Sequence, residues 1–279
     1  MKTKQILVVV LAVALMGVLL MQPIKGLVDK DKGASTETTE EVSSPYNLQT
    51  VSEMSKQSIN ATIAQEITAI EKQIEQVEGE GKVSLLQQLA DKWDDVAKAI
   101  PQGFVYEEMA RLSPTVGYWV KSGDAYREGY TNLQDTAMVS ALNQRAIAAY
   151  EQALALDDKN LSAKTGLGSA LVTGTNNPMQ GIALLREVVE EDPKNVEANK
   201  ALGLFSLQSQ QFDKAIDRFK TVVEQKPDAE SYFYLATGYE KIGLKNEAIA
   251  AYQKSKEMAA DPTLSQYIDR QIEALSQSN

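Results

Sequence analysis

The sequence predicts an all-α fold built from repeated helices, and two observations support this prediction. Apolar residues recur at spacings of three and four from residue 47 onward, which is the period of an amphipathic helix. A pattern of Leu, Gly, Ala and aromatic residues returns every 33 to 35 residues in the second half of the chain. An apolar run near the N-terminus precedes both patterns. With 279 residues, the chain is long enough for roughly one to two domains.

Residues 1–24 are expected to form a membrane anchor. Lys2 and Lys4 precede 16 residues, Ile6–Met21, that carry no charged side chain. This run is slightly shorter than a full span of about 17–25 residues, and the residues beside it lengthen it. Gln22–Leu27 offer no cleavage site of the A-x-A kind, and the chain has no Cys for a lipid anchor. We therefore expect an uncleaved signal anchor that contacts the membrane through residues 6–23.

The anchor also predicts the location of the rest of the chain. A short basic tail ahead of an apolar core resembles a signal anchor, which leaves the N-terminus in the cytoplasm. The folded part would then lie outside it, in a bacterial periplasm. Lys25, Lys30 and Lys32 balance the positive charges before the run, so a cytosol-facing array is the alternative. Residues 25–46 are rich in Ser, Thr and Glu and predict a disordered polar linker.

An amphipathic helix is expected over residues 47–82. Its apolar face follows a heptad spacing and consists of Ile63, Ile67, Ile70, Ile74 and Val77. Such a face can pack against the next helix as a cap on the domain, or it can form a homo-oligomer through Ile63, Ile67, Ile70 and Ile74. Both interpretations remain open from the sequence.

The repeat is clearest over three consecutive units. Its recurring positions hold Leu167, Gly168, Leu202, Gly203, Ala215, Phe219, Pro227, Tyr232, Leu235, Ala236, Tyr239, Ala248 and Tyr252. This pattern resembles the tetratricopeptide repeat (TPR), in which each unit is a pair of antiparallel helices. The resemblance implies a right-handed α-solenoid. A small residue would sit where the two helices cross closely, and an aromatic residue such as Phe219 or Tyr252 would fill the space between repeats.

The array is expected to cover residues 83–262 with about five repeats, of which the first two are degenerate. In the unit Val116–Lys159, Gly123 and Ala146 are 23 residues apart, compared with about 12 in the family. The extra residues either form an insertion or lengthen the helices. In the unit before it, Gln102 stands where Ala is expected. Residues 263–279 then predict an amphipathic helix that caps the open end of the array.

The resemblance also implies a groove lined by the first helix of each repeat. The inward positions include Ser162, Val172 and Glu230, and the expected partner-binding residues are Thr165, Ser169, Glu197, Lys200, Leu204, Leu207, Phe233, Thr237 and Glu240. This mixed surface suits an extended or helical peptide. Alternatively, Leu204, Leu207 and Phe233 pack within the helix stack. Only Lys200 matches the carboxylate-binding groove of chaperone-binding TPR proteins, so that activity is not expected here.

Composition argues against an enzyme. The chain has no His and no Cys, which removes the commonest general base, the thiol nucleophile and most transition-metal sites. We expect no catalytic residue, metal site or cofactor. Its net charge of −10 argues against nucleic acid as a partner.

The expected function is that of a membrane-tethered scaffold or adaptor that binds partner proteins through the groove. The combination of anchor, tether and array resembles bacterial envelope proteins that assist secretion, complex assembly or cytochrome maturation. Two alternatives remain: a homo-oligomeric scaffold at the membrane and a cytosol-facing TPR receptor.

Overall fold

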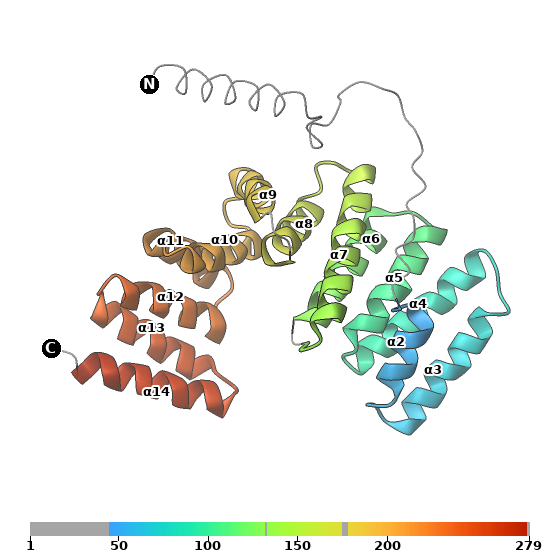
Figure 1. The fold of residues 1–279 in the computed structure, drawn as a ribbon, viewed down its shortest axis with the longest axis horizontal. Coiled ribbons are helices and arrows are strands. Elements are labelled where there is room, and N and C mark those ends of the chain that lie inside the picture. The colour runs from blue at the N-terminus through green and yellow to red at the C-terminus, as the bar shows by residue number, and fades with distance from the viewer. Residues whose placement is uncertain (1–44, 132, 175–177, 278–279) are drawn as a thin grey trace, which may run out of the picture. The chain divides into compact units, whose positions relative to one another are not determined.

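The computed structural model describes residues 45–131, 133–174 and 178–277, and within these ranges it contains thirteen α-helices and no strand (Figure 1). The helices are α2 (Leu48–Lys56), α3 (Ala61–Ile74), α4 (Glu80–Asp95), α5 (Ala99–Leu112), α6 (Val116–Tyr130), α7 (Thr136–Leu156), α8 (Leu161–Gly174), α9 (Pro178–Glu191), α10 (Val196–Gln208), α11 (Phe212–Gln225), α12 (Ala229–Lys241), α13 (Lys245–Met258) and α14 (Pro262–Gln277). The all-α class predicted from the sequence is therefore confirmed.

The predicted anchor, residues 1–24, and most of the predicted linker lie outside the described residues. Among the helices that are described, none is both long enough and apolar enough to cross a bilayer.

From α4 to α13 the helices form five consecutive hairpins, namely α4–α5, α6–α7, α8–α9, α10–α11 and α12–α13. Few residues separate the two helices of each pair, and the two helices pack together as antiparallel neighbours. The first helices of successive hairpins also touch one another, α6 against α8, α8 against α10 and α10 against α12. This is the arrangement of a TPR solenoid. The last helix, α14, packs on α13.

Capping residues explain where several helices begin. The side chain of Asn195 accepts a hydrogen bond from the backbone N–H of Ala198, and that of Asp228 accepts one from Ser231. Thr115 and Asp135 act in the same way at the starts of α6 and α7. Each cap satisfies a backbone donor that has no partner within its own helix.

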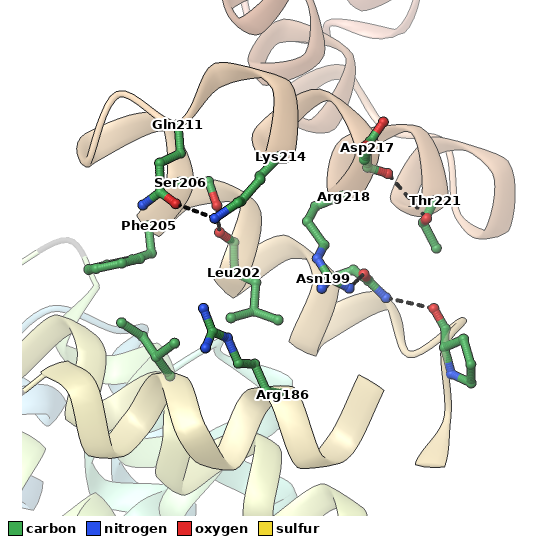
Figure 2. A pocket seen from close by; sticks show the side chains of 12 residues that line it. Arg186, Asn199, Leu202, Phe205, Ser206, Gln211, Lys214, Asp217, Arg218 and Thr221 are labelled. Atoms are coloured by element: carbon green, nitrogen blue, oxygen red, sulfur yellow. Dashed lines mark hydrogen bonds between the residues drawn. The ribbon is translucent and has the colours of Figure 1, made fainter. Parts of the chain in front are cut away.

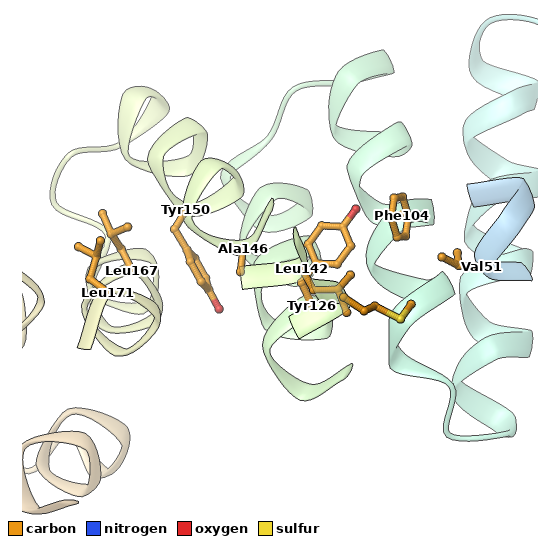
Figure 3. Packing of buried hydrophobic residues seen from close by; sticks show 9 residues of the cluster. Val51, Phe104, Tyr126, Leu142, Ala146, Tyr150, Leu167 and Leu171 are labelled. Atoms are coloured by element: carbon orange, nitrogen blue, oxygen red, sulfur yellow. The ribbon is translucent and has the colours of Figure 1, made fainter. Parts of the chain in front are cut away.

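Aromatic rings packed against glycines make several of the close helix contacts. A Cβ placed on Gly123 of α6 would lie 2.6 Å from Cζ of Tyr150 in α7. A Cβ on Gly203 of α10 would lie 2.8 Å from Cε2 of Phe219 in α11. Figure 3 shows Tyr126 and Tyr150 among the buried residues of one such stack. Because glycine has no side chain, the ring can lie directly on the helix backbone.

The recurring residues of the repeat mostly lie in these contacts. Leu167, Gly168, Leu202, Gly203, Ala215, Phe219, Leu235, Ala236, Ala248 and Tyr252 are buried, Tyr232 and Tyr239 are half-buried, and Pro227 is exposed in the turn before α12. Phe219 reaches the next repeat, as expected, and it also packs within its own hairpin. Its ring lies on Gly203 of its own hairpin and, with centroids 5.3 Å apart, beside Tyr234 of the next.

The extra residues of the second unit lengthen a helix. The helix α7 has 21 residues, compared with 14 in α9, α11 and α13. Met138 and Leu142, in its first turns, are buried in a cluster with Phe104 of α5 and Val51 of α2 (Figure 3). The lengthened helix thus reaches the helices that precede the second hairpin.

The single helix predicted over residues 47–82 is instead two helices, α2 and α3, separated by residues 57–60. Asn60 caps the second one, and Gly79, at φ 68°, stands before α4. The Ile face of α3 packs on the chain's own core, where Ile67 is fully buried with Leu86 and Trp93 of α4. The face thus packs as the predicted cap on the domain, and Ile63, Ile70 and Ile74 are half-buried against the same core.

The position of Ile67 generates a stability prediction. Replacing Ile67 with Ala should destabilise the protein by about 2–5 kcal/mol, because it leaves a cavity among close-packed side chains. Ile242 is 38% exposed at the end of α12, so Ile242→Ala should change stability by no more than about 0.5 kcal/mol. Urea unfolding followed by circular dichroism measures both. A lower oligomeric mass for Ile67→Ala in light scattering, without lost stability, would contradict the covered face.

The glycine contacts generate a second prediction within one helix. Gly123→Ala should destabilise the protein by about 1–3 kcal/mol, since its methyl group would collide with the buried Tyr150 ring. Gly117, also in α6, has open space around its Cβ position, so Gly117→Ala should be neutral or stabilising by up to about 1 kcal/mol. Thermal and urea unfolding of the two variants provide the comparison. Equal effects at both positions would show that the ring contact does not constrain α6.

Candidate functional site

The candidate binding surface is the face formed by α10 and α12, which we call the A-helix face. Its predicted residues come from successive turns of these helices. Lys200, Leu204 and Leu207 on α10 and Phe233, Thr237 and Glu240 on α12 are half-buried, while Glu197 and Glu230 are exposed. Because α10 and α12 contact each other, these residues lie on adjoining helices.

An ion pair bridges the two helices of this face. Nζ of Lys200 donates to Oε2 of Glu230 at 2.6 Å. Burial acts to lower the pKa of Lys200, but the hydrogen bond and charge of Glu230, with Asp228 and Glu197, raise it overall. Lys200 is therefore a cation at neutral pH. A pair exposed to this degree contributes at most about 1 kcal/mol, so an incoming charged group can displace it at low cost.

The apolar residues of the face belong partly to the core. Leu204, Leu207 and Phe233 pack against the buried cluster that contains Phe219, Leu235 and Tyr252. The Phe233 ring lies 5.7 Å from the Tyr252 ring and 5.8 Å from the Tyr267 ring of α14. The interpretation of these residues as part of the helix stack is thus correct for much of their surface. Their half-buried state leaves the remainder open to solvent.

The polar residues on α12 are held by local hydrogen bonds. Oγ1 of Thr237 donates to the backbone oxygen of Phe233 at 2.9 Å. Oε2 of Glu240 accepts from the hydroxyl of Tyr252 at 2.8 Å. Burial is the main cause of the raised pKa of Tyr252, which keeps that phenol protonated as a donor. The carboxylate of Glu240 is therefore positioned before any partner arrives.

The prediction that Thr165 and Ser169 of α8 line the groove was wrong. Thr165 and Ser169 are only 5% and 4% exposed, so neither lines an open surface. The reason is the number of glycines in α8. A Cβ on Gly166 would lie 2.2 Å from the Tyr150 ring, and one on Gly168 would lie 2.8 Å from Leu185. Because α7 and α9 approach α8 this closely, they leave its side chains little exposure.

A polar pocket lies between α9, α10 and α11, and the sequence analysis missed it (Figure 2). Its volume is about 370 Å³, and its lining includes Arg186, Asn199, Lys214 and Arg218. No motif spacing could have revealed it, because its lining residues come from three helices of two hairpins. The useful signal was weaker: two of the six arginines in an acidic chain fall in this short stretch.

Among the residues that the structure describes, no group of three or more acidic side chains is arranged to hold a metal ion. The A-helix face combines an apolar strip, one Lys and three Glu, which suits a peptide segment.

Two models of known protein families match this chain. A family model described as the cytochrome c-type biogenesis protein H TPR domain matches residues 84–233, and a second, a tetratricopeptide repeat, matches residues 206–264. The first match covers more than half of the chain and runs from α4 into α12. A search of curated proteins finds no significant match.

Solved structures with a similar fold include TPR proteins. A thermophilic TPR protein of Thermus thermophilus is 15% identical, with a TM-score of 0.51 over 70% of this chain and 98% of its own. MamA is 22% identical, with a TM-score of 0.46 over 63% and 91% of the two chains. YrrB, a TPR protein with an unusual peptide-binding site, is 20% identical, with a TM-score of 0.45 over 72% and 98%. At these identities the likeness concerns the fold alone.

The period of the repeat, the five observed hairpins and the family match agree, and the chain belongs to the tetratricopeptide-repeat family whose model is described as the cytochrome c-type biogenesis protein H TPR domain.

Proposed function

We propose that this protein is a membrane-tethered adaptor that holds a partner protein during the biogenesis of c-type cytochromes. The partner would lie along the A-helix face and be bound without being chemically changed. The observation that carries the proposal is that the face, with its apolar strip between charged side chains, falls within the segment matched by the family model or directly beside it.

The apolar strip supplies the affinity in this proposal. Leu204, Leu207 and Phe233 are held by the core beneath them, so a bound segment need not order them. Burying their remaining apolar surface contributes about 25 cal/mol per Å² of area removed from water. A rigid strip of this kind also loses little side-chain entropy on binding.

The charged residues supply orientation. Lys200 offers one cation, and Glu197, Glu230 and Glu240 offer three carboxylates on the same two helices. The surface therefore favours a segment with apolar side chains and more basic than acidic groups. The N-terminal apolar run, as an anchor, would keep the face close to a membrane, where membrane-bound or exported clients are concentrated.

Replacing Leu204 with Ser tests the face. We expect affinity for the partner to fall about tenfold, because one apolar contact worth about 1.5 kcal/mol is lost. Cells that depend on the variant should accumulate less protein with covalently attached haem, which haem staining of gels measures. Val223→Ser on α11 is the matched control, since Val223 is also half-buried against the same core cluster.

The comparison between these two variants decides the outcome. Reduced c-type cytochrome with Leu204→Ser and normal levels with Val223→Ser support the proposal, provided that both variants remain folded and abundant. Normal cytochrome levels with Leu204→Ser, or equal losses with both variants, would contradict it.

The location is a separate part of the proposal. We place the array outside the cytoplasm, as the basic tail before the apolar run predicts. A reporter enzyme that is active only outside the cytoplasm, fused after Asn279, should therefore be active in intact cells. A fusion that is produced at normal levels but inactive would place the array in the cytosol.

A further inference from the structure

The pocket between α9, α10 and α11 differs in chemistry from the A-helix face. Arg186 comes from α9, and Lys214 and Arg218 come from α11 (Figure 2). Asp217 is the one acidic side chain among the lining residues. Three cations against one carboxylate give the pocket a local positive charge on a chain whose net charge is −10.

Within residues 178–277, none of these cations is paired with a carboxylate, although Nζ of Lys214 donates to Oε1 of Gln211 at 2.6 Å. Lys200 pairs with Glu230 at 2.6 Å, and Arg145 with Glu107 at 3.0 Å. Within residues 178–277, all of which the structure describes, no carboxylate oxygen lies within 4.0 Å of the charged nitrogens of Arg186, Lys214 or Arg218. A cluster of cations without a paired carboxylate attracts an anion.

One of the arginines is held in place. Asn199 is 1% exposed, and its Nδ2 donates to the backbone oxygens of Asn195 at 2.8 Å and Pro193 at 3.0 Å. This orientation leaves its Oδ1 to accept from Nη1 of Arg218 at 2.9 Å. The guanidinium has five N–H groups, so the contact positions it without exhausting its donors.

Arg186 and Arg218 also repel each other. Burial, and next the positive charge of Arg186, lower the pKa of Arg218, and Asp217 only partly offsets them. A guanidinium nevertheless remains charged at neutral pH. A carboxylate placed between Arg186 and Arg218 would remove this repulsion.

The floor of the pocket is apolar. Ile182 and Leu202 are buried there, and Phe205 is half-buried. A free inorganic anion would make no use of this surface, and exposed Arg and Lys side chains alone bind such ions weakly in water. A peptide that carries an acidic and an apolar side chain side by side would use both parts of the pocket.

We propose that this pocket is a second docking site that takes an acidic segment of a partner protein. A Glu or Asp carboxylate is held by Arg186 and Arg218, and an adjacent apolar side chain rests on Leu202 and Phe205. The site uses the second helices of two hairpins together with α10, so its charge preference is the opposite of that of the A-helix face. It does not depend on the client proposed above.

Direct binding to the full chain in a non-ionic detergent tests this site. The probe is a fluorescein-labelled helical peptide of Leu and Glu, and its twin has Gln in place of each Glu. We expect the Glu peptide to bind, with an affinity that falls as salt rises, and the Gln twin to bind at least about tenfold more weakly. Fluorescence anisotropy measures both.

Variants connect this binding to the pocket. The double variant Arg186→Gln and Arg218→Gln should weaken binding of the Glu peptide about tenfold or more. Arg186→Gln alone should weaken it severalfold, and it leaves the Asn199 contact intact if the double variant fails to fold. The charge-matched control is Lys159→Gln with Lys226→Gln, two exposed lysines outside the pocket, which should leave binding unchanged.

Three results would overturn the proposal. One is unchanged binding of the Glu peptide by Arg186→Gln. The second is binding of the Gln twin with equal affinity. The third is arginine-dependent binding of inorganic phosphate or phosphatidylglycerol vesicles while the Glu peptide does not bind, since this would identify a free anion or a lipid as the ligand. Leu204→Ser should leave this binding intact, so the pocket and the A-helix face can fail separately.

Discussion

The fold depends on aromatic rings that occupy the space where glycine has no side chain. The clearest case is Tyr150 of α7, whose ring lies against Gly123 of α6 and Gly166 of α8. One side chain therefore sets the approach of α7 to the first helix of its own hairpin and to that of the next. Its hydroxyl donates to Asp124 at 2.6 Å, which fixes the ring further. Protein interiors are close-packed, so such contacts leave few alternative arrangements.

This constraint explains which part of the array is available for binding. Around α8 the glycine contacts on two sides bring α7 and α9 so close that Thr165 and Ser169 are buried. On α10 and α12 the corresponding contacts involve one neighbour each, Phe219 at Gly203 and Ile216 at Gly238. Leu204 and Phe233 accordingly stay half-buried. The packing that stabilises the array thus buries Thr165 and Ser169 and leaves Leu204 and Phe233 partly open to solvent.

Much of the fold can be predicted from the sequence, because local residue patterns determine the helices and the hairpins. The 34-residue period predicts the hairpins, since each unit must bury its apolar face against its neighbours. The break between α2 and α3 was missed because all the Ile residues of the heptad pattern follow Asn60. The pattern therefore gives no information about where the helix begins. The extension of α7 was left open, because Met138 and Leu142 find their partners on α2 and α5, far away in the sequence.

The candidate sites were less predictable than the fold. Repeat positions located Lys200, Leu204 and Phe233 on one face, but they could not show that Thr165 and Ser169 are covered, because burial depends on how closely α7 and α9 approach. The basic pocket was not predicted at all. Arg186 and Arg218 do not occupy equivalent repeat positions, and only the packing of α9 and α11 against α10 brings them to one cavity.

The most direct test of the central claim, that the A-helix face receives the partner, is site-specific photocrosslinking in intact cells. A photoreactive residue at Thr237 of α12 is compared with one at Gln253, which is exposed on α13. The account predicts that a protein of c-type cytochrome biogenesis is crosslinked from Thr237 and not from Gln253. Equal crosslinking from both positions, or crosslinking from Gln253 alone, would contradict it.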